Sequence, residues 1–139
     1  MSKKAVVLAC VVGLSLAGGG CGPLNGKYSG GAAAETSASS SALRLDVRSE
    51  RGGMAVMEEN IIRLALRDEA GNPVEQARIE AYLVMPGMFC GRIPAEARAV
   101  GPGQYELLAI PVMAGKWEAE ISVASDGDSL RAAHPFKAM

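Results

Sequence analysis

The sequence is poor in the residue types that carry most enzyme chemistry. Among its 139 residues there is one histidine, His134, and aromatic side chains make up only 4%. It has no Gly-x-Ser-x-Gly elbow, no phosphate-binding glycine loop and no Cys-x-x-Cys pair, so no nucleophile can be matched with a base. These absences predict a protein that is not an enzyme.

An excess of charge of either sign is also absent. Lys and Arg number 14 and Asp and Glu number 15, which gives a formal net charge of -1. A chain balanced in this way has no broad electrostatic attraction to nucleic acid or to anionic lipid. The sequence therefore predicts no nucleic-acid partner.

The first twenty residues have the order of an export signal. Lys3 and Lys4 precede an apolar run over residues 5–17, and the small residues Gly18-Gly19-Gly20 follow it. The run is shorter than the ~20 residues that a membrane-spanning helix needs. We therefore predict export with cleavage; the alternative is an uncleaved anchor or a buried helix.

The segment Leu16-Ala17-Gly18-Gly19-Gly20-Cys21 resembles the lipobox of bacterial lipoproteins, although Gly18 stands where that pattern prefers an aliphatic residue. The resemblance implies a signal peptide over residues 1–20, a diacylglyceryl thioether on Cys21 and N-acylation, for example with palmitate. Several acyl chains anchor a protein stably where one is marginal. Gly22 in place of aspartate implies the outer membrane, facing the periplasm. Ordinary secretion is the alternative.

Cysteine is scarce, and its positions exclude an intrachain disulfide in the exported protein. Of the three cysteines, Cys10 would leave with the signal, Cys21 would carry lipid and Cys90 would remain alone. A single thiol in an oxidising compartment is either buried and inert, or exposed and available for metal or exchange chemistry.

Large apolar residues are nearly missing from residues 21–42, which consist mainly of Gly, Ala and Ser. Such a composition cannot bury enough surface to offset the entropy of ordering. We predict a flexible tether here, which leaves residues 43–139 as one folded domain.

The folded part alternates apolar and polar residues, the period of half-buried strands. The predicted inward-facing sets are Leu43, Leu45 and Val47; Ile62, Leu64 and Leu66; Ile79, Ala81, Leu83 and Met85; and Trp117, Ala119, Ile121 and Val123. Turn residues separate them, and Gly101-Pro102-Gly103 predicts a hairpin between residues 95–100 and 104–108. A last strand is expected over residues 129–136. Residues 51–60 fit a short helical turn as well as an extended segment.

About seven strands in roughly a hundred residues predict an all-β fold, an immunoglobulin-like β-sandwich. A small barrel is the alternative. The order of the segments is similar to the YtkA-like and FixH-like domain family of bacterial periplasmic proteins. The similarity is carried by residues 60–68 with their Gly-Asn-Pro turn, by 76–88, by Gly103-Gln104-Tyr105 and by 113–117. It implies a β-sandwich over residues 43–136.

The family resemblance also implies a place to search for copper, because FixH-like members are linked to the assembly of haem-copper oxidases. Soft sulfur ligands select Cu(I), and Met85, Met88 and Cys90 lie within six residues at a strand end. Met113 is a further candidate at the same end. Core packing is the competing interpretation, above all for Met85, because methionine fills irregular core gaps. The family members that most resemble metal binders carry histidine shortly after the Met-Pro-x-Met unit, where this chain has Phe89, Cys90 and Gly91.

Two functional hypotheses follow. The first is a lipid-anchored, non-enzymatic accessory module that presents a loop face of the sandwich to a periplasmic protein. The second is a copper-binding or copper-delivery protein that uses Met85, Met88, Cys90 and Met113. His134 is interpreted as a structural histidine and Trp117 as a core anchor.

Overall fold

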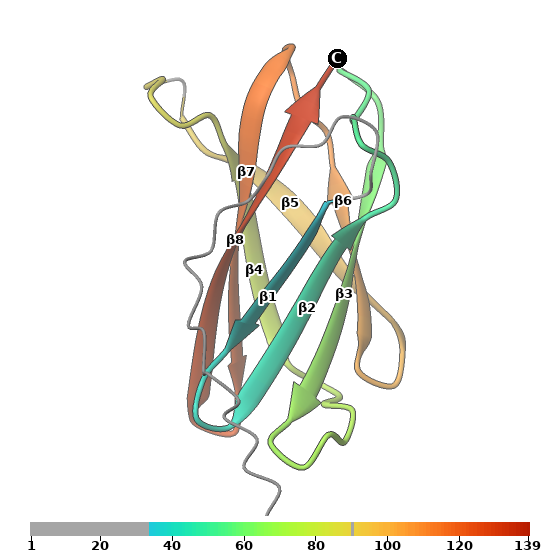
Figure 1. Cartoon of the computed structure of the whole chain (residues 1–139), viewed down its shortest axis with the longest axis vertical. Coiled ribbons are helices and arrows are strands. Elements are labelled where there is room, and N and C mark those ends of the chain that lie inside the picture. The colour runs from blue at the N-terminus through green and yellow to red at the C-terminus, as the bar shows by residue number, and fades with distance from the viewer. Residues whose placement is uncertain (1–33, 90) are drawn as a thin grey trace, which may run out of the picture.

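The computed structural model describes residues 34–89 and 91–139, which form eight antiparallel strands and contain no helix (Figure 1). The signal peptide predicted over residues 1–20, Cys21 and Cys90 lie outside the described residues. The strands are β1 (Glu35–Ser39), β2 (Leu43–Ser49), β3 (Asn60–Asp68), β4 (Arg78–Val84), β5 (Ile93–Gly101), β6 (Gln104–Ala109), β7 (Gly115–Ser125) and β8 (Asp128–Ala138).

The strands form a two-layered sandwich in which β5 belongs to both layers. The hydrogen-bonded order is β1-β2-β3-β6-β5-β4-β7-β8. Residues 93–95 of β5 pair with β4, whereas residues from Glu96 to Gly101 pair with β6. One layer therefore contains β1, β2, β3 and β6, the other contains β4, β7 and β8, and β5 crosses between them. The predicted β-sandwich is confirmed.

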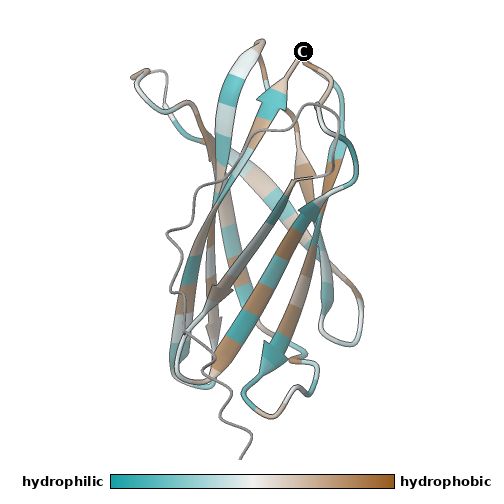
Figure 2. Cartoon of the chain, viewed as in Figure 1, coloured by the Kyte–Doolittle hydropathy of each residue, from teal (hydrophilic) through white to brown (hydrophobic). Residues whose placement is uncertain are grey.

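The predicted alternation along the strands is also confirmed. Leu45, Leu64 and Ile121 are fully buried or nearly so, while the intervening arginines of β2 and β3 face solvent. Figure 2 shows this alternation as hydrophobic and hydrophilic bands along β2 and β3. Trp117 and Phe136 stack in the core with ring centroids 6.4 Å apart. The inner faces of the two layers thus supply one continuous apolar core.

Strand β1 corrects the predicted extent of the tether. Residues 35–39 were assigned to the flexible segment, but they pair in register with β2, for example Thr36 with Val47 and Ala38 with Leu45. None of the five side chains is fully buried. The strand therefore depends on backbone pairing and on a few polar contacts, which a hydrophobic pattern does not reveal.

Residues 51–59 of the ambiguous segment form a loop rather than a helical turn, and Asn60 begins β3. Met54 forms an isolated bridge with Ala138, and Met57 has a positive φ of 61°. The Asn60 side chain holds the loop, because its amide donates to the carbonyls of Ala55 and Glu58 while its oxygen accepts from the Ala55 N–H. Bonds from one side chain to the backbone compete with helix formation at this point.

The Gly101-Pro102-Gly103 hairpin is confirmed, and Gly103 is needed for space as well as for its φ of 64°. A Cβ at Gly103 would lie 2.6 Å from the carbonyl oxygen of Leu66. Close by, the buried Tyr105 donates from its hydroxyl to the Val74 carbonyl at 2.9 Å and accepts from the Ala77 N–H. These contacts fix the β3–β4 connection against β6.

Candidate functional site

The connections between strands gather at two ends of the sandwich, because consecutive strands run in opposite directions. At one end lie the β2–β3, β4–β5 and β6–β7 connections, the last residue Met139, and Ala34, where the described chain begins. At the other lie the β1–β2, β3–β4, β5–β6 and β7–β8 connections.

Every methionine of the described residues belongs to the first end. These are Met54, Met57, Met85, Met88, Met113 and Met139. We call this end, made of residues 50–59, 85–92, 110–114 and 139, the methionine end. Methionine is unbranched and polarizable, so it suits adaptable apolar surfaces as well as soft metal ions.

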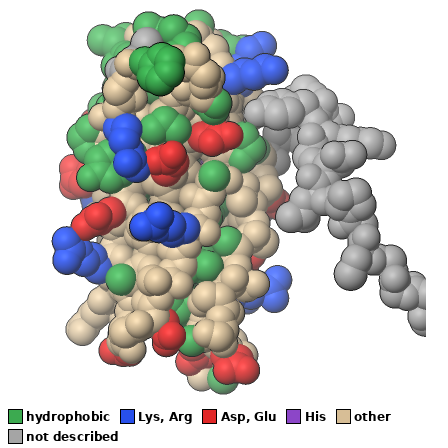
Figure 3. Space-filling view, turned by 90° about the vertical axis from the view of Figure 1, so that its left-hand side faces the viewer, with side chains coloured by type: hydrophobic (Ala, Val, Ile, Leu, Met, Phe, Trp, Pro, Cys, Tyr) green, Lys and Arg blue, Asp and Glu red, His purple; other side chains and the backbone are tan. Residues whose placement is uncertain are grey.

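The methionine end is also the main exposed apolar surface of the described part of the chain. Seven of the eight large hydrophobic side chains that are exposed there belong to it: Met57, Met88, Phe89, Ile110, Val112, Met113 and Met139. The eighth is Val100, near the opposite end. Figure 3 shows hydrophobic side chains gathered at the top of the molecule and acidic side chains at its base. Burying such groups against a partner is favourable, so a concentrated exposed patch indicates a binding surface.

Hydrogen bonds join the β2–β3 loop of the methionine end to the β6–β7 loop and to Met139. The Met57 N–H donates to the Pro111 carbonyl at 2.8 Å, which connects the β2–β3 and β6–β7 connections. The Met139 N–H donates to the Met54 carbonyl at 2.9 Å. The indole N–H of Trp117 donates to the Met113 carbonyl at 2.9 Å. The exposed side chains of the β2–β3 and β6–β7 loops therefore stand on a hydrogen-bonded base, whereas the bond given for the β4–β5 loop, from the Met88 N–H to the Met85 carbonyl, is internal to that loop.

The predicted sulfur site is only partly brought together. Met85 packs against the core, with its terminal methyl 2.6 Å from where a Cβ on Gly115 would stand. Met88 is 50% exposed and Met113 is 39% exposed, each on its own loop. Met85 and Met113 therefore approach the same end of the sandwich, as predicted. Met85 also takes the core position that its inward parity predicted.

No cluster of hard or borderline metal ligands accompanies these sulfurs. Within residues 34–89 and 91–139, no three His, Cys, Asp or Glu side chains lie close enough to hold a metal ion. Thioethers alone suit Cu(I) rather than Zn²⁺ or Ca²⁺, which prefer nitrogen, thiolate or oxygen ligands.

The only histidine of the sequence, His134, is fully buried and hydrogen-bonded, as a structural residue should be. Its Nδ1 lies 2.8 Å from the Thr36 hydroxyl and its Nε2 lies 3.3 Å from the Ser49 hydroxyl. Burial lowers the pKa of His134 from 6.5 to about 4, so the imidazole is neutral at pH 7. His134 therefore joins β8 to β1 and β2, and both of its ring nitrogens face hydroxyl groups.

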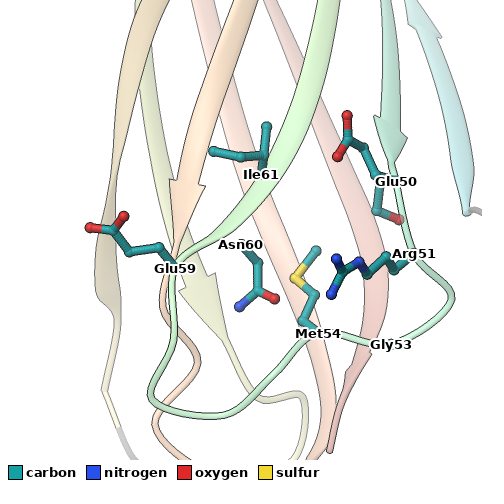
Figure 4. Close-up of a pocket in the computed structure, with 8 residues that line it drawn as sticks. Glu50, Arg51, Gly53, Met54, Glu59, Asn60 and Ile61 are labelled. Atoms are coloured by element: carbon teal, nitrogen blue, oxygen red, sulfur yellow. The ribbon is translucent and has the colours of Figure 1, made fainter.

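A shallow pocket of about 200 Å³ adjoins the methionine end between the β2–β3 loop and the start of β3. Figure 4 shows Asn60 and Met54 near its centre, with Arg51 beside Met54 and Glu59 on the far side. The Asn60 amide is already occupied by backbone carbonyls. The pocket thus offers no unpaired polar group of Asn60 to a small ligand.

The family model for YtkA-like domains matches residues 38–122, which is more than half of the chain. The chain belongs to the YtkA-like family. This confirms the YtkA-like part of the predicted resemblance, whereas the FixH-like part stays a prediction. The matched range takes in the β4–β5 and β6–β7 loops with Met85, Met88 and Met113.

Comparison with other proteins adds little to the family assignment. No curated protein matches the chain. Among solved structures, the Lin-41 filamin domain has 14% identity over 63% of this chain and 83% of its own, with a TM-score of 0.44. PcoC, a copper resistance protein from Escherichia coli, has 18% identity over 64% of this chain and 92% of its own, with a TM-score of 0.39. At these low scores neither likeness bears on function.

Sequence reasoning missed two features of this site. It did not find Thr36 and Ser49 as partners of His134, because β1 was assigned to the tether. It also did not group Met54, Met57 and Met139 with the sulfur cluster. A signal was available, because consecutive antiparallel strands run in opposite directions and alternate connections therefore lie at opposite ends.

The described residues contain no helix long and apolar enough to cross a membrane.

Proposed function

We propose that this YtkA-like protein is a non-enzymatic interaction module of the cell envelope, and that it binds through the methionine end. The observation that carries the proposal is the concentration of seven of the eight exposed large apolar side chains at that end. Surface apolar residues scattered singly need no explanation, but a one-ended patch does.

The proposal includes the predicted lipid anchor, a thioether on Cys21, which would hold the domain at the periplasmic face of the outer membrane. It is supported by the lipobox-like segment 16–21 alone. Labelled fatty acid should enter the wild-type protein and not the Cys21→Ser variant. Equal labelling of the two would remove the anchor from the proposal.

Photocrosslinking in the native envelope tests the binding surface. A photoreactive amino acid at Met88 or at Met113 should give the same adduct, whether with protein or with lipid. The matched control is Val100, which is 53% exposed but lies away from the methionine end. Adducts of equal yield from all three positions, or none from Met88 and Met113, would contradict the proposal.

Copper binding is the second candidate, favoured by the presence of Met85, Met88 and Met113 on two loops of one end. Methionine sulfur fits Cu(I), which binds two or three soft ligands. Cys90 is the predicted thiol of the set. Cu(I) would be the cargo that the protein passes to a partner, and these residues would only hold the ion.

Competition of the full-length chain with a Cu(I) chelator tests this second function. We expect one Cu(I) per chain, and loss of binding in the double variant Met88→Leu with Cys90→Ser. The variant Met57→Leu is the matched control, because Met57 belongs to the same end but not to the proposed set. Unchanged affinity in the double variant would reject the site.

A further inference from the structure

We infer that the methionine end docks onto the lipid bilayer itself, with the tips of the β4–β5 and β6–β7 loops entering the interface between headgroups and acyl chains. This inference rests on the proposed function, because it names what the methionine end binds. It is a contact made by the folded domain and is separate from the predicted acyl chains on Cys21.

The exposed side chains suit the fluid surface of a bilayer better than a groove in a folded partner. Phe89 is fully exposed at the tip of the β4–β5 loop, beside the half-exposed Met88. Val112 and Met113 are 46% and 39% exposed on the β6–β7 loop. Separate apolar tips can each enter a fluid interface, where an aromatic ring and flexible thioethers lose contact with water.

If Cys21 carries lipid, as the sequence predicts, a tether from Cys21 to Ala34 would bring this end, and not the opposite one, to the membrane. The described chain begins at Ala34, whose carbonyl accepts from the Ser49 N–H at the methionine end. Thirteen residue steps separate Ala34 from Cys21. A Gly-rich chain of that length spans on average about 20 Å.

The length of the domain favours contact between the methionine end and the bilayer over contact between the opposite end and the bilayer. Strand β7 has 11 residues, so the sandwich is about 35 Å long. To place its opposite end on the bilayer, the tether would have to run the whole length of the domain, close to its limit of ~45 Å. The methionine end is reached without such extension.

The charges of the two ends select the same orientation. The opposite end, which we call the acidic end, carries Asp68, Glu69, Glu75, Asp126 and Asp128. Its connections contain no Lys or Arg, and three arginines, Arg44, Arg67 and Arg78, lie within the first or last two residues of the adjoining strands, so the acidic residues outnumber the basic ones. An anionic bilayer surface repels this end. Repulsion falls off over a Debye length of ~8 Å, so it acts when the acidic end approaches the membrane.

Two lysines stand directly behind the apolar tips. Lys116 and Lys137 are exposed cross-strand partners on β7 and β8, and neither joins an ion pair with another described side chain. Like charges placed opposite one another are unfavourable in an isolated sheet. Phosphate groups of lipid headgroups would offset that repulsion, and each lysine near an anionic surface strengthens binding about fivefold.

The acidic residues of the methionine end limit which loops enter. Glu58 and Glu59 are exposed on the β2–β3 loop beside Met57. Carboxylates are costly within the interface, so this loop is expected to stay among the headgroups. The β4–β5 and β6–β7 tips have no carboxylate between residues 85 and 92 or between 110 and 114, and they are the segments that enter.

Fluorescence quenching of the full-length, lipid-anchored protein tests the inference. The protein is reconstituted into protein-free vesicles of phosphatidylethanolamine and phosphatidylglycerol with brominated acyl chains. Phe89→Trp places a probe at the predicted tip, and Ala70→Trp places one on the exposed β3–β4 turn of the acidic end. Both variants retain the buried Trp117, whose signal is subtracted using the wild type.

We expect the tryptophan at position 89 to lose most of its emission and to shift to the blue, while the one at position 70 changes little. Adding Lys116→Gln and Lys137→Gln should reduce quenching at position 89, and omitting phosphatidylglycerol should abolish that difference. Equal quenching at positions 70 and 89, or none at position 89, would overturn bilayer docking.

The same probes separate this inference from the proposed function. If position 89 is not quenched, yet Met88 and Met113 crosslink to one protein in the native envelope, the methionine end binds that protein. The bilayer inference is then wrong and the proposed function stands. If neither lipid nor protein is contacted from the methionine end, both fail.

Discussion

At the scale of single residues, His134 shows most directly how burial sets a chemical property. It is fully buried, and its two ring nitrogens face the hydroxyls of Thr36 and Ser49, which either donate or accept. Neutral imidazole satisfies both contacts, whereas the protonated ring would bring an unpaired charge into the core. The residue is therefore a source of acid sensitivity rather than a metal ligand.

We predict that the free energy of unfolding falls between pH 6.5 and pH 4 because of His134. Its pKa is lowered from 6.5 to about 4 in the folded state, so the unfolded chain takes up the proton first. The contribution of neutral His134 to the free energy of unfolding is thus fully present above pH 6.5. It is lost as the pH falls, by ~3 kcal/mol near pH 4. Urea unfolding at several pH values measures this.

The control for this prediction is His134→Gln, which keeps polar atoms but has no titrating ring. The variant will be less stable at pH 7, so the quantity compared is the slope of stability against pH. Carboxylates contribute the same slope to both proteins. Identical slopes in the wild type and the variant would show that His134 does not cause the loss.

At the scale of elements, β1 is a strand that the alternation of apolar and polar residues does not predict. Strands β2, β3, β4 and β7 were predicted from alternating Leu, Ile and Val residues that bury one face. Strand β1 has the sequence Glu-Thr-Ser-Ala-Ser and buries no residue completely. Its position is set by pairing with β2 and by Thr36, contacts with residues up to 98 positions away. The local sequence of β1 therefore does not predict these distant partners.

The β1 contact predicts a difference between two neighbouring substitutions. Thr36→Val keeps the β-branched shape but removes the hydroxyl 2.8 Å from His134 Nδ1. We expect a loss of about 1–3 kcal/mol, because a buried ring nitrogen is left without a partner. Thermal or urea unfolding measures the loss.

The matched substitution is Ser37→Val, one residue along the same strand. Ser37 is exposed and its hydroxyl donates to Asp46 at 2.6 Å on the surface. We expect a change within about 0.5 kcal/mol, since exposed polar contacts contribute little. If Ser37→Val is the more destabilising of the two, the contact between β1 and His134 is not what holds the strand.

Part of the candidate site was predictable, because strand patterns place some of its residues whereas tertiary contacts place the others. Met85 and Met113 were placed at one end because each adjoins the end of a strand whose pattern was clear. Met54 and Met57 lie in the segment 51–60, whose form depends on the Asn60 side chain and on a backbone bond to Pro111. Those contacts are tertiary. The order of the connections could place Met54 and Met57 at this end, but no periodic pattern predicts the form of the segment.

At the scale of the whole molecule, the protein is polarised along its length. Thioethers and other apolar side chains occupy one end, acidic side chains occupy the other, and the apolar core joins them (Figure 3). A nearly neutral net charge conceals this separation, because the formal sum of -1 says nothing about where the charges lie. The polarity gives the domain a defined orientation relative to any surface that it meets.

We predict that mild peroxide distinguishes the methionines by their position in the fold. Met57 and Met139, 70% and 67% exposed, should be oxidised first, followed by Met88 and Met113. Met54 is only 3% exposed and should be protected until the protein unfolds. Peptide mass spectrometry over a time course measures the order. Oxidation of Met54 at the rate of Met57 would contradict the described loop.

The crossing of β5 between the layers has a mechanical consequence. Sandwiches whose sheets share only side-chain contacts have a seam along which the two halves can slide or part. Here one unbroken strand is bonded to β4 at its beginning and to β6 along the rest, so a load on either sheet is carried into the other through covalent backbone. When the domain is pulled, the two sheets should therefore unfold together in one step instead of separating from each other first.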